Sequence, residues 1–130
     1  MSLNNSWYGL NLLPIYVDII DERLESVCLQ LKNLENVRTN PQQLNSETLT
    51  RIMKYCYAQK ENNQAYFEQC SQWRNSTPNE EQLQLIARIE KSAAKLEFIN
   101  QEILKLVESY QKKDQQWWKK TLKLTFDVFH

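Results

Sequence analysis

The sequence predicts an all-α protein, an antiparallel up-down-up bundle of three long helices with an ambiguous C-terminal segment. Three segments carry apolar residues at alternating steps of three and four, which is the spacing of one helix face. The connections between these segments are short, and helices joined by short connections run antiparallel. One glycine and three prolines among 130 residues are too few for the many tight turns of a β-rich fold.

The length is typical of one domain, so we assign residues 1–130 to a single helical domain with a leader over 1–13. The spacing predicts the first helix over 15–38. Pro14 stands directly before Ile15, at the expected start of the helix, where a proline loses no hydrogen bond. Pro41 disfavours a helical conformation at Asn40 and so ends the helix. The predicted core positions of this helix are Val17, Ile20, Leu24, Val27, Leu31 and Leu34.

The second helix is expected over 47–74, with Ser46 as its cap because a serine hydroxyl can accept from free amides. Its apolar seam is interrupted in the middle by Gln59 and Asn63. One interpretation is a polar core layer that sets the register of the helices. The alternative is a groove left incompletely filled, which a helix of a partner completes.

The third helix is expected over 78–113. Thr77, Pro78 and Glu80 have the spacing of a capping box with a proline at the first helical position. The aromatic and basic tail, 114–130, fits two patterns: it alternates like a strand from Leu122 to Val128, and it also has a helical stripe. We expect continued or broken helix, such as a short fourth helix, with a strand as the alternative.

Helix lengths provide the main functional lead. The three segments would be about 36, 42 and at least 51 Å long, so the third overshoots its neighbours by about one to two turns even on the shortest estimate. We therefore expect its apolar face and overhanging end to bind a protein partner or a second copy, through Leu106, Tyr110, Trp117 and Trp118. The two tryptophans also allow plain packing against Trp7 and Tyr8 of the leader.

Charge suggests a different class of function as the alternative. The net charge is zero, but lysines dominate the C-terminal part of the chain and acidic residues the first helix. A basic and aromatic end can lie on an anionic membrane surface or stack nucleic-acid bases. The overall composition lacks the basic excess of a typical nucleic-acid-binding domain.

Catalytic chemistry is poorly represented. The single histidine is His130, so a base to activate a serine, threonine or cysteine nucleophile is missing. We expect no enzymatic activity, no cofactor, no metal and no small-molecule substrate. Cys28, Cys56 and Cys70 are expected to be buried free thiols of a cytoplasmic protein, because no signal peptide precedes them.

The layout resembles the small helical export chaperones of flagellar and type III secretion systems. The resemblance rests on Glu47-Thr48-Leu49 through Lys60-Glu61-Asn62-Asn63, then on the stretch Leu96-Glu97-Phe98-Ile99-Asn100-Gln101-Glu102-Ile103. It covers about residues 15–111, and the bulky aromatic tail departs from it. The resemblance implies that an export substrate lies along the apolar surface of the third helix, and it transfers no individual residue.

Overall fold

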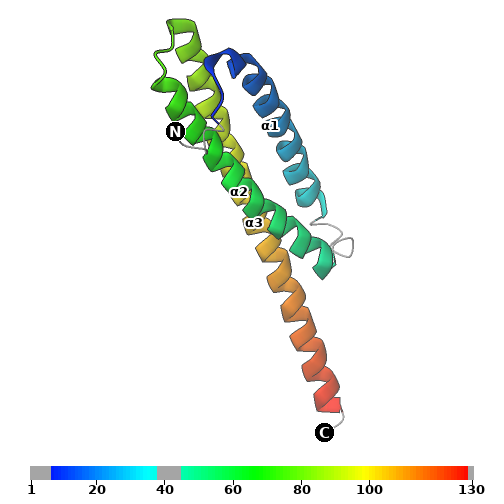
Figure 1. The fold of residues 1–130 in the computed structure, drawn as a ribbon. Helices are drawn as coiled ribbons and strands as arrows, with labels where there is room; N and C mark the ends of the chain where they lie inside the picture. Colours follow the sequence, from blue (N-terminus) through cyan, green and yellow to red (C-terminus); the bar gives the residue numbers. More distant parts are fainter. Residues whose placement is uncertain (1–6, 38–44, 129–130) are drawn as a thin grey trace.

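The fold is all-α. The computed structural model describes the backbone of residues 7–37 and 45–128, with side chains up to residue 113. A single turn of 3-10 helix, η1 (Leu10–Leu12), leads into α1 (Leu13–Asn36), which is followed by α2 (Ser46–Arg74) and α3 (Glu80–Val128) (Figure 1). These three long helices confirm the predicted helical bundle. The described ranges contain no strand.

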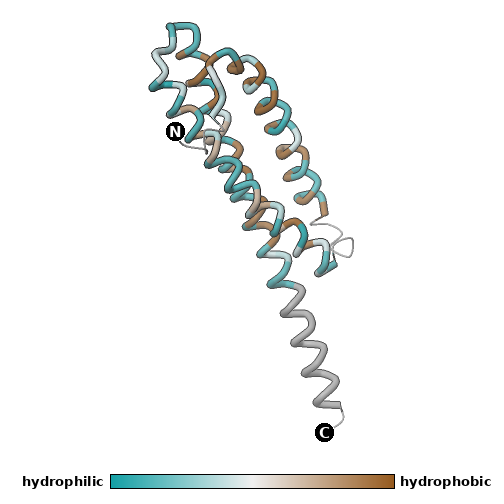
Figure 2. The backbone as a smooth tube through the Cα atoms, in the orientation of Figure 1, coloured by the Kyte–Doolittle hydropathy of each residue, from teal (hydrophilic) through white to brown (hydrophobic). Residues whose placement is uncertain are grey.

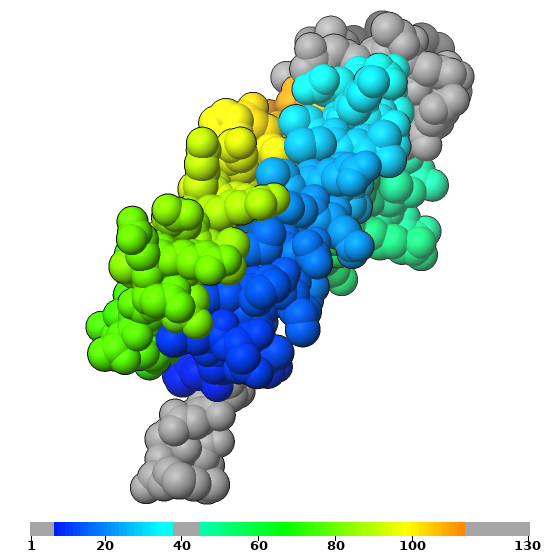
Figure 3. Space-filling view, turned by 90° about the horizontal axis from the view of Figure 1, so that it is seen from above, coloured from blue at the N-terminus to red at the C-terminus, as the bar shows by residue number. Residues whose placement is uncertain are grey.

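The helices α1 and α3 run in the same direction. The guanidinium of Arg88 donates to the carboxylate of Asp21 at 2.6 Å. Further along both helices, the hydroxyl of Tyr110 donates to the carbonyl oxygen of Leu34 at 2.7 Å. Figure 3 shows α1, blue to cyan, packed along the yellow-to-orange length of α3.

The helix α2 runs antiparallel to α3. Arg74, at the end of α2, pairs with Glu90 near the start of α3. Asn100, further along α3, donates to the carbonyl oxygen of Cys56 at 2.9 Å. The main helix contacts of the described chain are those of α3 with α2 and with α1 (Figure 1). The order of directions is therefore up, down, up.

The start of α2 differs by one residue from the prediction. The side chain of Asn45 accepts a hydrogen bond from the amide of Thr48 at 2.8 Å, so Asn45 is the cap and Ser46 is the first helical residue. Asparagine and serine cap helices about equally well, and the sequence alone does not choose between neighbours.

The capping box of α3 also lies two residues later than predicted. Asn79 accepts from the amide of Gln82 at 2.8 Å, and the Gln82 side chain accepts from the amide of Asn79 at 2.9 Å. Thr77 has a φ of 52°, the left-handed region, so it belongs to the turn. The prediction of Thr77 and Glu80 as the box is wrong because Asn79 and Gln82 bind each other's amides reciprocally, while the Thr77 hydroxyl donates to the carbonyl oxygen of Ser76.

The core is divided into two clusters along the bundle. We call the end with the leader and the α2–α3 turn proximal, and the end from which α3 continues distal. In Figure 2 apolar and polar residues alternate along α1 at helical spacing. The buried residues of the proximal cluster are Leu13, Val17, Ile20, Val27, Tyr66, Cys70, Trp73, Ile86, Ile89, Ala93 and Leu96. Those of the distal cluster are Leu34, Leu49, Cys56, Ile103, Leu106, Val107 and Tyr110.

Polar side chains lie between the two clusters. Asn63 is 2% exposed and Asn100 is 4% exposed, whereas Gln59 is half-buried. Within the described ranges, every fully buried side-chain nitrogen and oxygen has a hydrogen-bond partner. The burial of Asn63 agrees with the interpretation of a polar core layer.

The helix α3 continues far beyond its neighbours. At 49 residues it is about 74 Å long, against about 36 Å for α1. Beyond Tyr110 its backbone extends about 27 Å further, or five turns, which exceeds the minimum of one to two turns expected from the sequence. The alternatives of a fourth helix or a strand are wrong, because no glycine or proline interrupts the helix up to Val128 (Figure 1). We call residues 111–128 the α3 projection.

Candidate functional site

The leader is held against α2 through its main chain. The amide of Tyr8 donates to the side-chain oxygen of Gln69 at 2.9 Å, and the Gln69 nitrogen donates to the Tyr8 carbonyl oxygen at 3.2 Å. The indole nitrogen of Trp73 donates to the same carbonyl at 2.8 Å. Gln69 and Trp73 are almost fully buried. The sequence offered no signal for this contact, because 61 positions separate the two residues that exchange hydrogen bonds.

Aromatic rings surround this contact. The ring of Tyr16 lies 5.6 Å from that of Tyr8, 6.3 Å from that of Tyr66 and 5.0 Å from that of Trp73, between centroids. The last two contacts are edge-on, an arrangement that aromatic pairs prefer. Burial, with smaller effects of the two neighbouring tyrosines, raises the pKa of the Tyr16 hydroxyl. The ring of Tyr16 therefore joins the leader to α2 through aromatic contacts.

A hollow of about 540 Å³ opens between α1 and α2 beside the leader. The guanidinium of Arg23 lies over the ring of Tyr66, 5.8 Å from its centroid. We call this space the proximal hollow. Its lining residues are Trp7, Tyr8, Leu12, Ile15, Tyr16, Ile19, Arg23, Asn62, Ala65, Tyr66 and Gln69.

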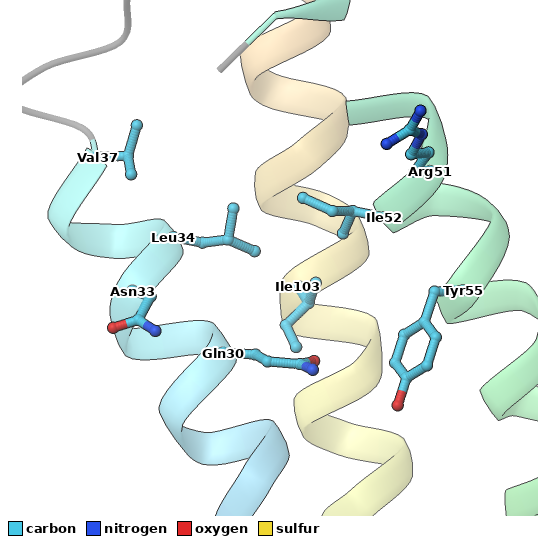
Figure 4. A pocket seen from close by; sticks show the side chains of 8 residues that line it. All are labelled: Gln30, Asn33, Leu34, Val37, Arg51, Ile52, Tyr55 and Ile103. Carbon is cyan, nitrogen blue, oxygen red and sulfur yellow. The ribbon is translucent and has the colours of Figure 1, made fainter. Parts of the chain in front are cut away.

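A second opening, which we call the distal groove, lies between the other ends of α1 and α2. It has a volume of about 390 Å³, and Ile103 of α3 forms its floor (Figure 4). Ile52 and Tyr55 face it from α2. Arg51 at its rim pairs with Glu47 at 2.7 Å. The lining residues are Gln30, Asn33, Leu34, Val37, Arg51, Ile52, Tyr55 and Ile103.

Two of the predicted partner-binding residues are part of the core. Leu106 is 9% exposed and Tyr110 is 7% exposed, and both pack in the distal cluster. The expectation that they are bare is wrong because α1 reaches further along α3 than helix lengths suggest. Leu34, in the last turn of α1, lies level with Tyr110 and accepts its hydrogen bond.

The other two predicted residues, Trp117 and Trp118, lie on the α3 projection, and their side chains fall outside the described part of the chain. The interpretation that they pack against Trp7 and Tyr8 does not agree with the course of the backbone. The leader lies at the proximal end, whereas position 117 is about 46 Å along α3 from Ile86 in the proximal cluster.

The three cysteines differ in exposure. Cys56 and Cys70 are buried as expected, but Cys28 is exposed, so the prediction of burial is wrong for it. Burial, with a smaller contribution from the Glu90 charge, raises the pKa of the Cys70 thiol to about 12. Burial also raises the pKa of Cys56. The two buried thiols are therefore held in their protonated, unreactive form.

Comparison with protein families, with curated proteins and with solved structures finds no match for this chain. The described residues bring together no group of three or more side chains suited to hold a metal ion. No helix in the described ranges is both long enough and apolar enough to cross a membrane. The proximal hollow and the distal groove are therefore the candidate functional sites of the described chain.

Proposed function

We propose that this chain is a non-enzymatic protein-interaction protein. A helix of a partner protein, or of a second copy, docks in the distal groove and against the α3 projection. The observation that carries the proposal is the position of the distal groove. It opens at the end of the bundle from which α3 continues, so a docked helix would contact both surfaces (Figures 1 and 4).

The groove has the chemistry of a helix-binding site. Its floor and walls are apolar and consist of Leu34, Val37, Ile52 and Ile103. Its rim is polar and includes Gln30. Amphipathic helices bind such grooves by placing apolar residues at helical spacing into the space between two helices. Because α1 and α2 both pack mainly on α3, a helix lying between them would complete a four-helix arrangement.

Tyr55 is the best residue with which to test the groove. It is 46% exposed and lines the groove, whereas Tyr57, two positions on, is 53% exposed and lies outside the lining. Residues two apart on a helix point to different faces. Tyr55→Glu and Tyr57→Glu therefore introduce the same charge at similar exposure, but only the first puts it into the groove.

The experiment places a photo-crosslinker at position 55 or 57 in the native cell and identifies what each captures. The captured protein is then purified, and its affinity is measured by calorimetry for the wild type and both glutamate variants. We expect capture from position 55 and a loss of affinity of at least about tenfold for Tyr55→Glu alone, since the docked helix would desolvate the new charge. Equal affinities for the two variants would contradict the proposal.

Sedimentation velocity over a dilution series separates the two kinds of partner. A second copy gives a dimer that dissociates on dilution and that Tyr55→Glu weakens, whereas a monomer at all concentrations leaves a different protein as partner. With a different protein as partner, we propose that this chain is an export chaperone of the cytoplasm, which holds a segment of its substrate.

Lys105, Lys112 and Lys113 are exposed near the α3 projection. Salt-sensitive binding to anionic vesicles or RNA, unaffected by Tyr55→Glu, would instead favour a membrane-surface or nucleic-acid function.

A further inference from the structure

We propose that the proximal hollow is a second binding site, which takes an extended, acidic segment of a polypeptide by its main chain. This goes beyond the docking of a helix in the distal groove and uses different residues. The observation behind it is the way in which the leader is already held at the edge of the same hollow.

The leader shows what kind of backbone this surface recognises. Gln69 donates to the carbonyl of Tyr8 and accepts from the amide of the same residue. An extended residue presents both groups to one side, whereas a helix uses them internally. The side chains of α2 bind the main chain of Tyr8 and not its ring, because the ring makes none of these hydrogen bonds and the residue stays 51% exposed.

A second side-chain amide, that of Asn62, lines the same hollow. Asn62 precedes Gln69 by seven positions, so it lies on the same face of α2, about 10.5 Å away. The Gln69 amide is already bound to Tyr8, so Asn62 is the side-chain amide left to bind the main chain of a second segment. Asn62 is exposed, and its side chain has no hydrogen-bond partner among the described residues. Ala65 lies between the two amides and lines the hollow, and its small side chain lets a main chain approach closely.

The charge of the hollow favours an acidic segment. Arg23 is half-buried over the ring of Tyr66, and the described residues include no ion-pair partner for it. The hollow contains no acidic residue among its lining. On the α1 side, Ile15 and Ile19 are 53% and 42% exposed and offer contacts to apolar side chains. Ile15, Ile19 and Arg23 follow one another at steps of four along one face of α1, so a segment lying along this face needs an acidic residue opposite Arg23 and apolar residues beside it.

The test uses the full chain and a fluorescent peptide, Phe-Asp-Leu-Asp-Phe-Asp, with capped ends. Three matched peptides replace its aspartates by asparagine, replace them by lysine, or methylate the backbone nitrogens of alternate residues. Fluorescence anisotropy should show binding of the acidic peptide and a loss of affinity of about tenfold for the asparagine peptide. The methylated peptide should lose about threefold to tenfold, because it lacks main-chain donors while it keeps an extended conformation.

Variants locate the site on the protein. Arg23→Gln should abolish the preference for the acidic peptide, whereas Lys32→Gln, an equal charge change on another face of α1, should leave it unchanged. Asn62→Ala should weaken binding, and Gln64→Ala should not. Circular dichroism verifies the fold of each variant.

The inference is overturned if no peptide binds, if the methylated peptide binds as tightly as its parent, or if the paired variants behave alike. It is also overturned if Tyr55→Glu weakens the peptide as much as Arg23→Gln does, since the peptide would then lie in the distal groove. Failure of the distal docking proposal leaves these results unaffected, so the two proposals fail independently.

Discussion

Replacement of Tyr110 by phenylalanine tests how the end of α1 is held. Its hydroxyl donates to the carbonyl oxygen of Leu34 at 2.7 Å, and both residues are buried. Leu34 lies in the last turn of α1, where carbonyl groups lack a donor from within the helix. Tyr110→Phe keeps the ring and its packing, so it removes little besides this hydrogen bond.

Two contributions determine how far the free energy of unfolding falls in Tyr110→Phe. A typical intramolecular hydrogen bond contributes about 1 kcal/mol net, and a buried carbonyl left without a donor costs about 1–3 kcal/mol. Because Leu34 is still 7% exposed, water relieves part of this cost, and we expect the free energy of unfolding to fall by about 1.5 kcal/mol. With a denaturant slope of about 1–3 kcal/mol per molar urea, the midpoint should fall by about 0.5–1.5 M.

Urea unfolding followed by circular dichroism measures this change, and Tyr66→Phe is the matched control. Tyr66 is 8% exposed, and its hydroxyl has no hydrogen-bond partner among the described residues. We expect a change below about 0.5 kcal/mol for it. Equal destabilisation by the two variants, or none by Tyr110→Phe, would refute the role of the hydroxyl as a cap of α1.

Two further predictions concern the thiols and an ion pair. In the native protein at pH 8, Ellman's reagent should react rapidly with Cys28 alone, and with Cys56 and Cys70 only after unfolding; more than one rapid thiol would contradict their burial. The hydrogen bond from Arg74 lowers the pKa of Glu90 below its usual 4.5, so its contribution to stability is present above that pH and is lost as the pH falls through the lower folded pKa. Arg74→Gln should therefore reduce the stability lost between pH 7 and pH 3 in urea unfolding, and an unchanged loss would contradict the pair's role.

The core of the bundle was predictable because burial repeats with the helix. Of the six residues assigned to the first seam from spacing alone, Val17, Ile20, Val27 and Leu34 are buried. The other two, Leu24 and Leu31, are half-buried and pack against the core clusters. The strand-like alternation of 122–128 was misleading because a short segment can fit two periods at once.

The candidate site was less predictable because it depends on how far one helix is shifted along another. Helix lengths place Tyr110 beyond the end of the bundle, but the pairing of Leu34 with Tyr110 shows that α1 covers it. The hydrogen bonds between Tyr8 and Gln69 join segments that are distant in the sequence, and a glutamine in a helix is ordinarily a solvated residue. Such contacts have no local pattern in the chain.

The division of the core by Asn63 and Asn100 has a consequence for how the molecule opens. Apolar clusters that are separated by a polar layer can lose their packing independently, as cooperative units of unequal free energy. The proximal cluster is the larger and includes Trp73, so its amides should exchange with solvent most slowly. Local unfolding around the distal cluster would widen the distal groove while the proximal cluster stays folded.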